Sequence, residues 1–263
     1  MAESKIIIHV PLGGNELAKQ ALEIINQDEE IYTMWEMTNT NAQKRIGFSD
    51  HGPVHFQIVA NGALRMTRIL AKHHIEMGIV KDYGLTPHHA ELVVILGSLF
   101  HDLGMTINRE GHEEFSLFIA YNVLDKVLSF LPTRERVIVK AETLHAIINH
   151  RDDGRPTTTE GAIVRIADAL DMSEGRSRMP FEKGEVNIHS LSAYAIDKVE
   201  ILEGTTVPLE INIYMNNSSG LFQVDELLKQ KIKNSGIEKF CQVKAYVVGE
   251  TEKKLLSEFV VGS

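Results

Sequence analysis

The segment that most restricts the fold of this chain is residues 92–103, which read LVVILGSLFHDL. On a helix these residues are apolar on nearly every side, and only Ser98, His101 and Asp102 interrupt the pattern. A helix that is apolar all round is typical of one buried inside a protein. The chain must therefore surround this helix with other elements, and its two ionisable side chains arrive together at the helix end.

A second stretch of the same kind spans residues 162–172, AIVRIADALDM, where Arg165, Asp168 and Asp171 interrupt an otherwise apolar pattern. Carboxylates that start inside a protein need a partner, because an unpaired buried charge costs several kcal/mol. A divalent cation is one such partner, and imidazole with carboxylate suits Mn, Fe, Co, Ni or Zn. Pairing within the helix is an equally good alternative, since Arg165 lies three residues before Asp168 and can neutralise it on the same face.

Helical spacing of apolar residues dominates the first two thirds of the chain. Proline at position 53 suits the first turn of a helix, and glycine or proline separates several of the helical segments. The pattern predicts a bundle of helices at residues 16–26, 53–78, 87–103, 112–131, 133–150 and 159–172.

From about residue 184 the pattern changes to short apolar or alternating runs that are typical of strands. The expected strands cover residues 199–202, 209–215, 243–248 and 256–261, with one helix at 224–234. The fold class expected is therefore mainly α, with a helical bundle followed by a small α+β domain. The chain divides into an N-terminal helical extension at 1–50, a helical metal-binding domain at 51–183 and an accessory α+β domain at 184–263.

Composition places the chain among ordinary globular proteins, with 43% hydrophobic and 24% charged residues in 263. The formal net charge of −9 is spread without long acidic or basic blocks, which argues against an extended nucleic-acid footprint. No stretch approaches the roughly 18 apolar residues that a membrane span requires. The single cysteine, Cys241, leaves no internal disulfide to form. We therefore expect a soluble cytoplasmic protein.

The other histidines decide how the His-Asp pair is interpreted, because chance alone would supply about half of one such dipeptide in this chain. His51 and His55 lie four residues apart at the start of a helix, a spacing that can put two imidazoles on one face. His112 opens another helix, and His145 and His150 flank the end of the next. Taken singly, each is more often a surface or core histidine than a ligand. Their order along the chain is the stronger signal.

The order His55, then His101 with Asp102, then Asp168 resembles the HD superfamily of metal-dependent phosphohydrolases. The segment HFQIVANGA is similar to the family's first ligand-bearing helix, LGSLFHDLG to the helix that ends in the His-Asp pair, and IVRIADALD to the late helix with the last aspartate. The resemblance covers about residues 50–175. It implies a helical fold, a divalent metal centre and hydrolysis of a phosphate ester or anhydride.

Some members of the superfamily, including the HD-GYP branch, carry extra histidines and bind two metals, and His112 and His150 occupy comparable positions here. The chain departs from that branch, because NHRDDGRP contains one histidine where two are usual and no GYP follows. Met105 also stands where lysine often follows HD-x-G in the wider family. A cyclic dinucleotide is therefore not the expected substrate. His145 is either a substitute for the missing histidine or an ordinary histidine on a helix face.

The resemblance also implies roles for individual residues. The implied ligands of one or two divalent ions (Mn, Fe, Co, Ni, Zn or Mg) are His55, His101, Asp102, Asp168, His112 and His150, with Asp102 as the bridge if two ions bind. Further candidates are His51, His145 and Asp171. Arg109, Arg176 and Arg178 are candidates to neutralise substrate phosphate by charge-assisted hydrogen bonds, although plain surface arginines would need no explanation.

The function expected from these residues is that of a metal-dependent phosphohydrolase, with His101 and Asp102 at its catalytic core. It would cleave a phosphate ester or phosphodiester of a small nucleotide or nucleotide-like substrate by metal-activated water. The alternative is a non-catalytic module that senses a nucleotide or metal and signals or dimerises through its C-terminal domain. We also expect a homo-oligomer without a membrane partner.

Overall fold

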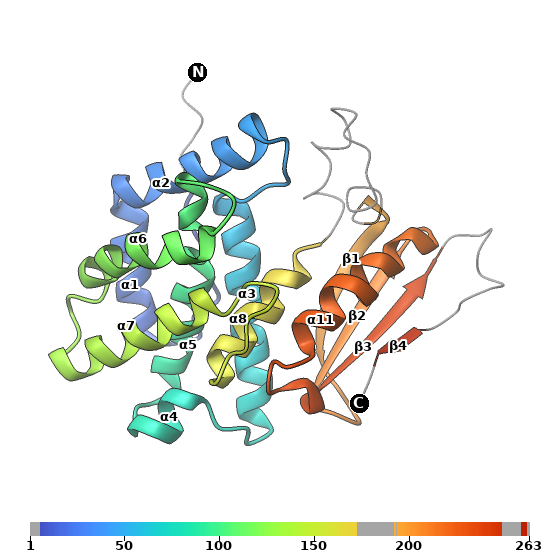
Figure 1. Ribbon diagram of the computed structural model, residues 1–263. Coiled ribbons are helices and arrows are strands. Elements are labelled where there is room, and N and C mark those ends of the chain that lie inside the picture. The colour runs from blue at the N-terminus through green and yellow to red at the C-terminus, as the bar shows by residue number, and fades with distance from the viewer. Residues whose placement is uncertain (1–5, 173–191, 193, 249–258, 262–263) are drawn as a thin grey trace.

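The computed structural model describes residues 6–172, 192, 194–248 and 259–261, and it contains a helical bundle beside a small sheet domain (Figure 1). The helices of the bundle are α1 (Glu16–Gln27), α2 (Glu29–Asn39), α3 (Pro53–Lys72), α4 (Gly78–Tyr83), α5 (Pro87–Phe100), α6 (His112–Val127), α7 (Thr133–Ile148) and α8 (Thr159–Leu170). The predicted fold class, mainly α with a small α+β C-terminal part, is confirmed.

Helix α5 lies at the centre of the bundle, as its apolar sequence predicts. It packs against α1, α3, α7 and α8, and the side chains from Leu92 to Phe100 are all buried. Its start is fixed by Pro87 in the first turn and by a capping box between Thr86 and His89. Because α5 is enclosed on every side, the residues that follow its last turn also begin inside the protein.

Several helices end two to six residues before the predicted bounds, and the largest difference is at α3. Helix α3 ends at Lys72 and not near residue 78, because the chain turns at His74, which has a positive φ of 60°. A separate short helix, α4, then begins at Gly78, where the buried carboxylate of Glu160 accepts hydrogen bonds from the first backbone N–H groups at 2.8 and 2.9 Å. A glutamate from a distant helix thus caps α4, and no local pattern announces such a cap.

Helix α2 belongs to the predicted N-terminal helical extension, although its bounds were not predicted. Asp28 caps its N-terminus by accepting from Ile31 N at 3.1 Å. Trp35 is buried, and its indole Nε1 donates to the carbonyl of Leu99 at 3.0 Å. This one side chain anchors α2 to the last turn of α5, and a π-helical turn at Thr40–Arg45 then leads towards α3.

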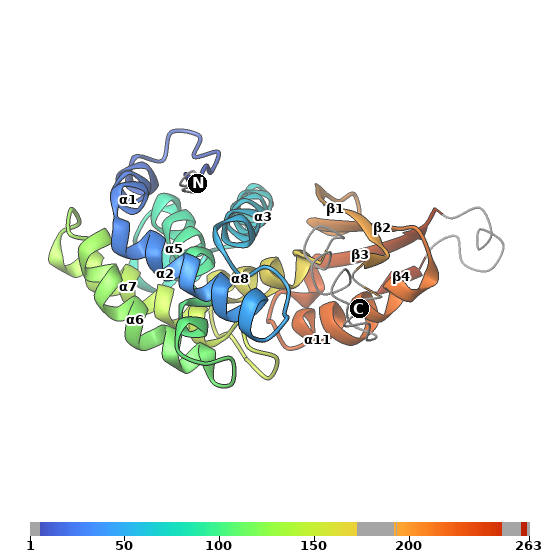
Figure 2. The same cartoon turned by 90° about the horizontal axis from the view of Figure 1, so that it is seen from above.

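Among its described residues, the C-terminal domain has a four-stranded sheet in the order β1-β2-β3-β4, with bounds Ile196–Glu203, Leu209–Met215, Cys241–Val247 and Phe259–Val261. The pairs β1/β2 and β3/β4 are antiparallel, whereas β2/β3 is parallel and requires a crossover. The crossover contains the π-helical turn Gln223–Leu228 and the helix α11 (Lys229–Ile232), which lie on one face of the sheet (Figure 2). Buried Val224 and Leu228 close the domain's core.

The small domain packs on the two helices of the bundle that run along its near side, α3 and α8 (Figure 2). Strand β1 approaches α3 so closely that a Cβ added to Gly62 would lie 3.4 Å from Ile201 Cδ1. Lys72 and His73 both pair with Glu203 of β1, at 2.6 and 3.0 Å. Helix α11 contacts α8. Within the described part of the chain, every helix is too short or too polar to cross a lipid bilayer.

Candidate metal centre

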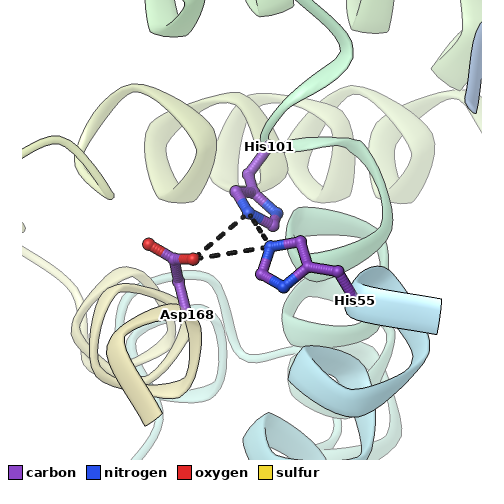
Figure 3. A group of neighbouring side chains, drawn as sticks. All are labelled: His55, His101 and Asp168. Carbon is purple, nitrogen blue, oxygen red and sulfur yellow. Dashed lines mark hydrogen bonds and ion pairs between the residues drawn. The ribbon is translucent and has the colours of Figure 1, made fainter. Parts of the chain in front are cut away.

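Three side chains from different helices meet at one point in the bundle (Figure 3). His55 comes from the first turn of α3, His101 follows the last residue of α5, and Asp168 lies in the last turn of α8. The Nε2 atoms of the two imidazoles are 3.2 Å apart, and each lies 3.6 Å from Oδ1 of Asp168. Both histidines are fully buried, so these donor atoms face one another and not bulk water.

Asp102 joins this group to a second pair of histidines. Its Oδ2 lies 3.3 Å from His101 Nε2 and 3.6 Å from His55 Nε2. Its Oδ1 lies 3.0 Å from His112 Nε2 and 3.5 Å from His150 Nε2, and those two nitrogens are 3.3 Å apart. One carboxylate therefore presents a separate oxygen to each of two nitrogen pairs.

The turn after the His-Asp pair lies directly against the start of α6. A Cβ added to Gly104 would lie 2.0 Å from the carbonyl oxygen of His112, so only glycine permits this approach. The hydroxyl of Ser116 accepts from Gly104 N at 2.8 Å and donates to the carbonyl of His101 at 2.6 Å. These contacts place His112 beside Asp102, although ten residues of chain separate them.

The second ring nitrogen of each histidine holds its orientation. His101, His112 and His150 each direct Nδ1 at a backbone carbonyl three residues earlier in the chain, at 2.8, 2.9 and 2.6 Å. His55 Nδ1 lies 2.6 Å from Oδ2 of Asp171. A carbonyl or carboxylate oxygen accepts, so each Nδ1 is the donor and each Nε2 lone pair is directed into the cluster.

This arrangement fits a divalent cation in both halves of the cluster. Two Nε2 lone pairs that face each other at 3.2 or 3.3 Å repel unless a cation, either a proton or a metal ion, lies between them. A first-row metal at about 2.0–2.1 Å from each donor separates neighbouring donors by about 3.0–3.4 Å. The donor separations here are 3.0–3.6 Å. The His/Asp cluster could thus hold metal, with a donor set of nitrogen and carboxylate oxygen.

Electrostatics in the cluster favour a cation at the same place. Burial lowers the pKa of His101, but the carboxylates of Asp102 and Asp168 outweigh it and raise that pKa to about 10. Burial raises the pKa of both carboxyl groups, and the neighbouring His101 outweighs it and holds them well below their usual range. Burial lowers the pKa of the His150 imidazole. Without metal, a proton on His101 supplies the positive charge that the two carboxylates require.

A pH dependence follows for the metal-free protein. Because the folded-state pKa of His101 lies above its unfolded value, its contribution to stability is fully present below about pH 6.5 and is lost as the pH rises towards 10. We expect urea unfolding midpoints in the presence of chelator to fall between pH 6.5 and pH 8.5. With Mn²⁺ the midpoint should fall less, since metal replaces the proton. Equal chelated midpoints at the two pH values would contradict this assignment.

Asp171 supports the cluster through the outer ring nitrogen of His55. Its carboxylate holds His55 Nδ1 at 2.6 Å. Partners of this kind orient a metal-binding imidazole, and their loss commonly weakens metal affinity by about 10–100-fold. We therefore expect Asp171→Asn to weaken metal binding within that range while the fold is retained, as measured by metal titration of the chelated protein. A variant with unchanged affinity would show that His55 is oriented by other contacts.

The other residues singled out from sequence have varied positions. His51 directs Nε2 towards Asp102 Oδ2 at 3.9 Å and Nδ1 at the carbonyl of Ser49, so it lies at the edge of the cluster. Arg109 stacks on Phe48, with its guanidinium carbon 4.6 Å from the ring centroid, and its Nη1 lies 3.3 Å from His112 Nδ1.

His145 is not brought to the cluster. Its Nε2 accepts from Thr157 N at 3.1 Å, and its Nδ1 lies 3.3 Å from the amide of Asn149, which is the behaviour of a helix-face histidine that supports a loop. Met105, where the wider family often has lysine, is fully buried. Arg176 and Arg178 lie outside the described residues.

The internal pairing that sequence left open for Asp168 is not what the structure contains. Arg165 donates instead to backbone carbonyls, among them Asp152 at 2.9 Å and Lys231 at 3.0 Å. Asp168 faces His55 and His101 with one oxygen, and its other oxygen lies 3.9 Å from the ammonium of Lys231. The partners of this half-buried carboxylate are thus the two cluster histidines and a lysine from the other domain.

Sequence reasoning missed two charged residues at the cluster. Glu113 directs Oε2 at His112 Nδ1 at 3.2 Å and forms a possible ligand group with His112 and His150. Its position next to His112 was the available signal. Lys231 comes from α11 of the C-terminal domain, some 60 residues after Asp168, and no spacing in the sequence indicates that it would reach the bundle.

The groove between α3 and β1, with a volume of about 890 Å³, is separate from the donor atoms. It is lined by Ile58 and Arg65 of α3, by β1, and by Asp171. The carboxylate of Asp171 contacts Nδ1 of His55, which is the ring nitrogen that faces away from the cluster. The guanidinium of Arg65 donates to the carbonyl of Ile201 across this groove. The facing nitrogen pairs do not line this groove, so the metal-binding chemistry belongs to the cluster and not to the groove.

Comparisons with known proteins converge on the same helices. Residues 59–173 match the family described as HD domain, a range that contains His101, Asp102 and Asp168 and starts four residues after His55. The chain is 35% identical over 246 residues to an uncharacterized protein (MJ1020) of Methanocaldococcus jannaschii, which covers 93% of this chain and 94% of the relative. No solved structure matches the chain.

Proposed function

This chain belongs to the HD-domain family, whose members are generally metal-dependent hydrolases, and from that premise we propose that it is a phosphohydrolase. Its proposed substrate is a phosphate ester or phosphodiester of a nucleotide or nucleotide-like molecule. The observation that carries the proposal is the position of Asp102, which presents one oxygen to each of two oriented histidine pairs. A carboxylate in that position suits a bridge between two divalent ions, as in enzymes that cleave phosphate esters.

The proposed roles divide the cluster into two halves. His55, His101 and Asp168 would hold one ion, His112 and His150 would hold the other, and Asp102 would bridge them. Imidazole and carboxylate donors favour Mn, Fe, Co, Ni or Zn over Mg, which prefers oxygen ligands and water. Such ions, when bound, lower the pKa of coordinated water towards neutrality and polarise a phosphoryl oxygen.

The chain's own residues would fix the geometry and the charge around the reacting phosphate. Hydrogen bonds from each Nδ1 hold the imidazoles, so little reorganisation is needed when a substrate arrives. The side chains of Asp102 and His150 are 4% exposed, whereas that of Asp168 is 16% exposed. A substrate would therefore approach from the side of Asp168. Arg109, whose Nη1 lies 3.3 Å from His112 Nδ1, would donate to a substrate phosphate.

The test is a comparison of metal content and turnover. Purified protein would be analysed for bound metal, stripped with chelator, reloaded with Mn²⁺, and assayed on a chromogenic phosphodiester and a panel of nucleotides. Turnover that depends on metal supports the proposal, and the panel identifies the substrate class. Bound metal without turnover of any member of the panel would favour the non-catalytic sensing module. A protein that binds no metal would overturn both functions.

A further inference from the structure

A lysine of the C-terminal domain lies at the edge of the metal-binding cluster. Lys231, on α11, has its ammonium 3.9 Å from Oδ2 of Asp168 and 3.1 Å from Oδ1 of Asp152, and it donates to the carbonyl of His150. Its side chain is 11% exposed, so the charge is largely withdrawn from water. Helix α11 belongs to a different domain from every cluster residue described above.

A second buried cation fixes the position of this lysine. Arg165 of α8 donates its Nε to the carbonyl of Lys231 at 3.0 Å and one Nη to the carbonyl of Gln230 at 3.4 Å. Its other bonds go to carbonyls of the loop after α7, at Asn149, Arg151 and Asp152. The loop that carries His150 and the helix that carries Lys231 are thus tied to the same guanidinium. Each nitrogen of that guanidinium donates to a backbone carbonyl, so the role of Arg165 is structural.

The present partners of Lys231 bind its ammonium weakly enough for an anion to replace them. Asp152 is 90% exposed, and a pair with such a carboxylate contributes little to stability. The carbonyl of His150 is neutral, so its bond to the ammonium is weaker than a bond to a phosphate oxygen. The lysine also lies on the side of Asp168, the most exposed of the implied ligands in the pairs described above. A phosphate oxygen bound at Asp168 would therefore lie close to the ammonium, which is 3.9 Å from Oδ2 of that residue.

We propose that Lys231 is a catalytic residue of the bundle's active site, binding a phosphoryl oxygen of the substrate beside the metal ligands. The C-terminal domain is then part of the active site and not only an accessory domain. This inference rests on the proposed phosphohydrolase function. A fixed ammonium in a site of low water content stabilises negative charge on phosphate much more strongly than a surface lysine does.

The test measures phosphate binding apart from turnover. Wild-type protein and Lys231→Gln, both loaded with Mn²⁺, would be compared for Mn²⁺ stoichiometry and for the Kd of inorganic phosphate by calorimetry. We expect unchanged stoichiometry and at least a tenfold weaker Kd in Lys231→Gln. Lys231→Arg should bind phosphate within about threefold of wild type. The control is Lys229→Gln, on the same helix but 52% exposed and paired with Asp225, which should bind phosphate as wild type does.

Each contrary outcome overturns a defined statement. Phosphate binding by Lys231→Gln at wild-type strength, or no phosphate binding by the wild type, would overturn the proposal. Loss of Mn²⁺ from Lys231→Gln, with no rescue by Lys231→Arg, would overturn it in favour of a positioning role through Asp168. If Lys231→Gln does not fold, Lys231→Met, of similar length, gives the same comparison. If the wild type binds phosphate but cleaves no ester, the proposed function fails while the phosphate measurement still decides the role of Lys231.

Discussion

Replacing Asp102 with asparagine is expected to reduce metal-dependent turnover at least about 1,000-fold, equivalent to about 4 kcal/mol of activation barrier. The carboxylate faces His101 with Oδ2 and His112 with Oδ1, at 3.3 and 3.0 Å. An amide has the same shape, but it offers one neutral oxygen and one N–H₂ donor. One of the two histidine pairs would then face the N–H₂ group in place of an oxygen. The negative charge that Asp102 shares between both halves of the cluster would also be lost.

Metal analysis and kinetics on the same preparations check this result. Asp102→Asn should retain at most one of the ions that the wild type binds, with a folded circular dichroism spectrum. The matched control is Asp125→Asn on α6, an exposed carboxylate that pairs with Lys140 at 2.8 Å, which should leave metal content and turnover unchanged. A variant at Asp102 that keeps two ions and normal turnover would remove the bridging role proposed for it.

The second large effect concerns stability. We expect Arg165→Gln to lower the free energy of unfolding by at least about 3 kcal/mol. The side chain is 1% exposed and donates to the backbone carbonyls of Asn149, Arg151, Asp152, Gln230 and Lys231. Each buried carbonyl left without a donor costs about 1–3 kcal/mol, and glutamine can reach few of these oxygens.

Urea unfolding of the chelated protein measures this loss without a contribution from metal. The control is Arg155→Gln, on the same loop but with an exposed side chain, which should change the unfolding free energy by less than about 0.5 kcal/mol. Because Arg165 ties α11 to the loop of His150, the variant should also weaken phosphate binding as Lys231→Gln does. An Arg165→Gln protein as stable as wild type would mean that water replaces the guanidinium at these carbonyls.

Much of the helical bundle could be predicted from local patterns. The apolar sequence of residues 92–103 predicted the central buried helix, and α1, α6, α7 and α8 begin at the predicted residues. The strand at Leu209–Met215 has the predicted bounds. The end of α3 and the separate α4 were not predicted, because a carboxylate from Glu160 in another helix caps α4.

The cluster itself was predicted in part. The order of His55, His101 with Asp102, and Asp168 indicated which side chains to examine, and in the structure both histidines lie within 3.6 Å of each carboxylate. The sequence left open whether Arg165 or a metal ion neutralises Asp168, because the spacing of three residues between Arg165 and Asp168 is compatible with both. In the structure Arg165 donates to backbone carbonyls, and the ammonium of Lys231 lies 3.9 Å from Oδ2 of Asp168.

The sequence by itself determined which segments form the helices and which residue types lie at the helix ends. Burial and hydrogen bonding within a helix depend on neighbours three or four positions away, so local spacing is enough to predict them. Only the tertiary structure decided that the two oxygens of Asp102 face different histidine pairs and that Asp171 holds Nδ1 of His55. It also decided that Lys231 of the sheet domain completes the charge around Asp168. The contacts of Asp102 with His112 and of His55 with Asp171 join residues 10 and 116 positions apart, and packing of whole elements, not local spacing, sets such distances.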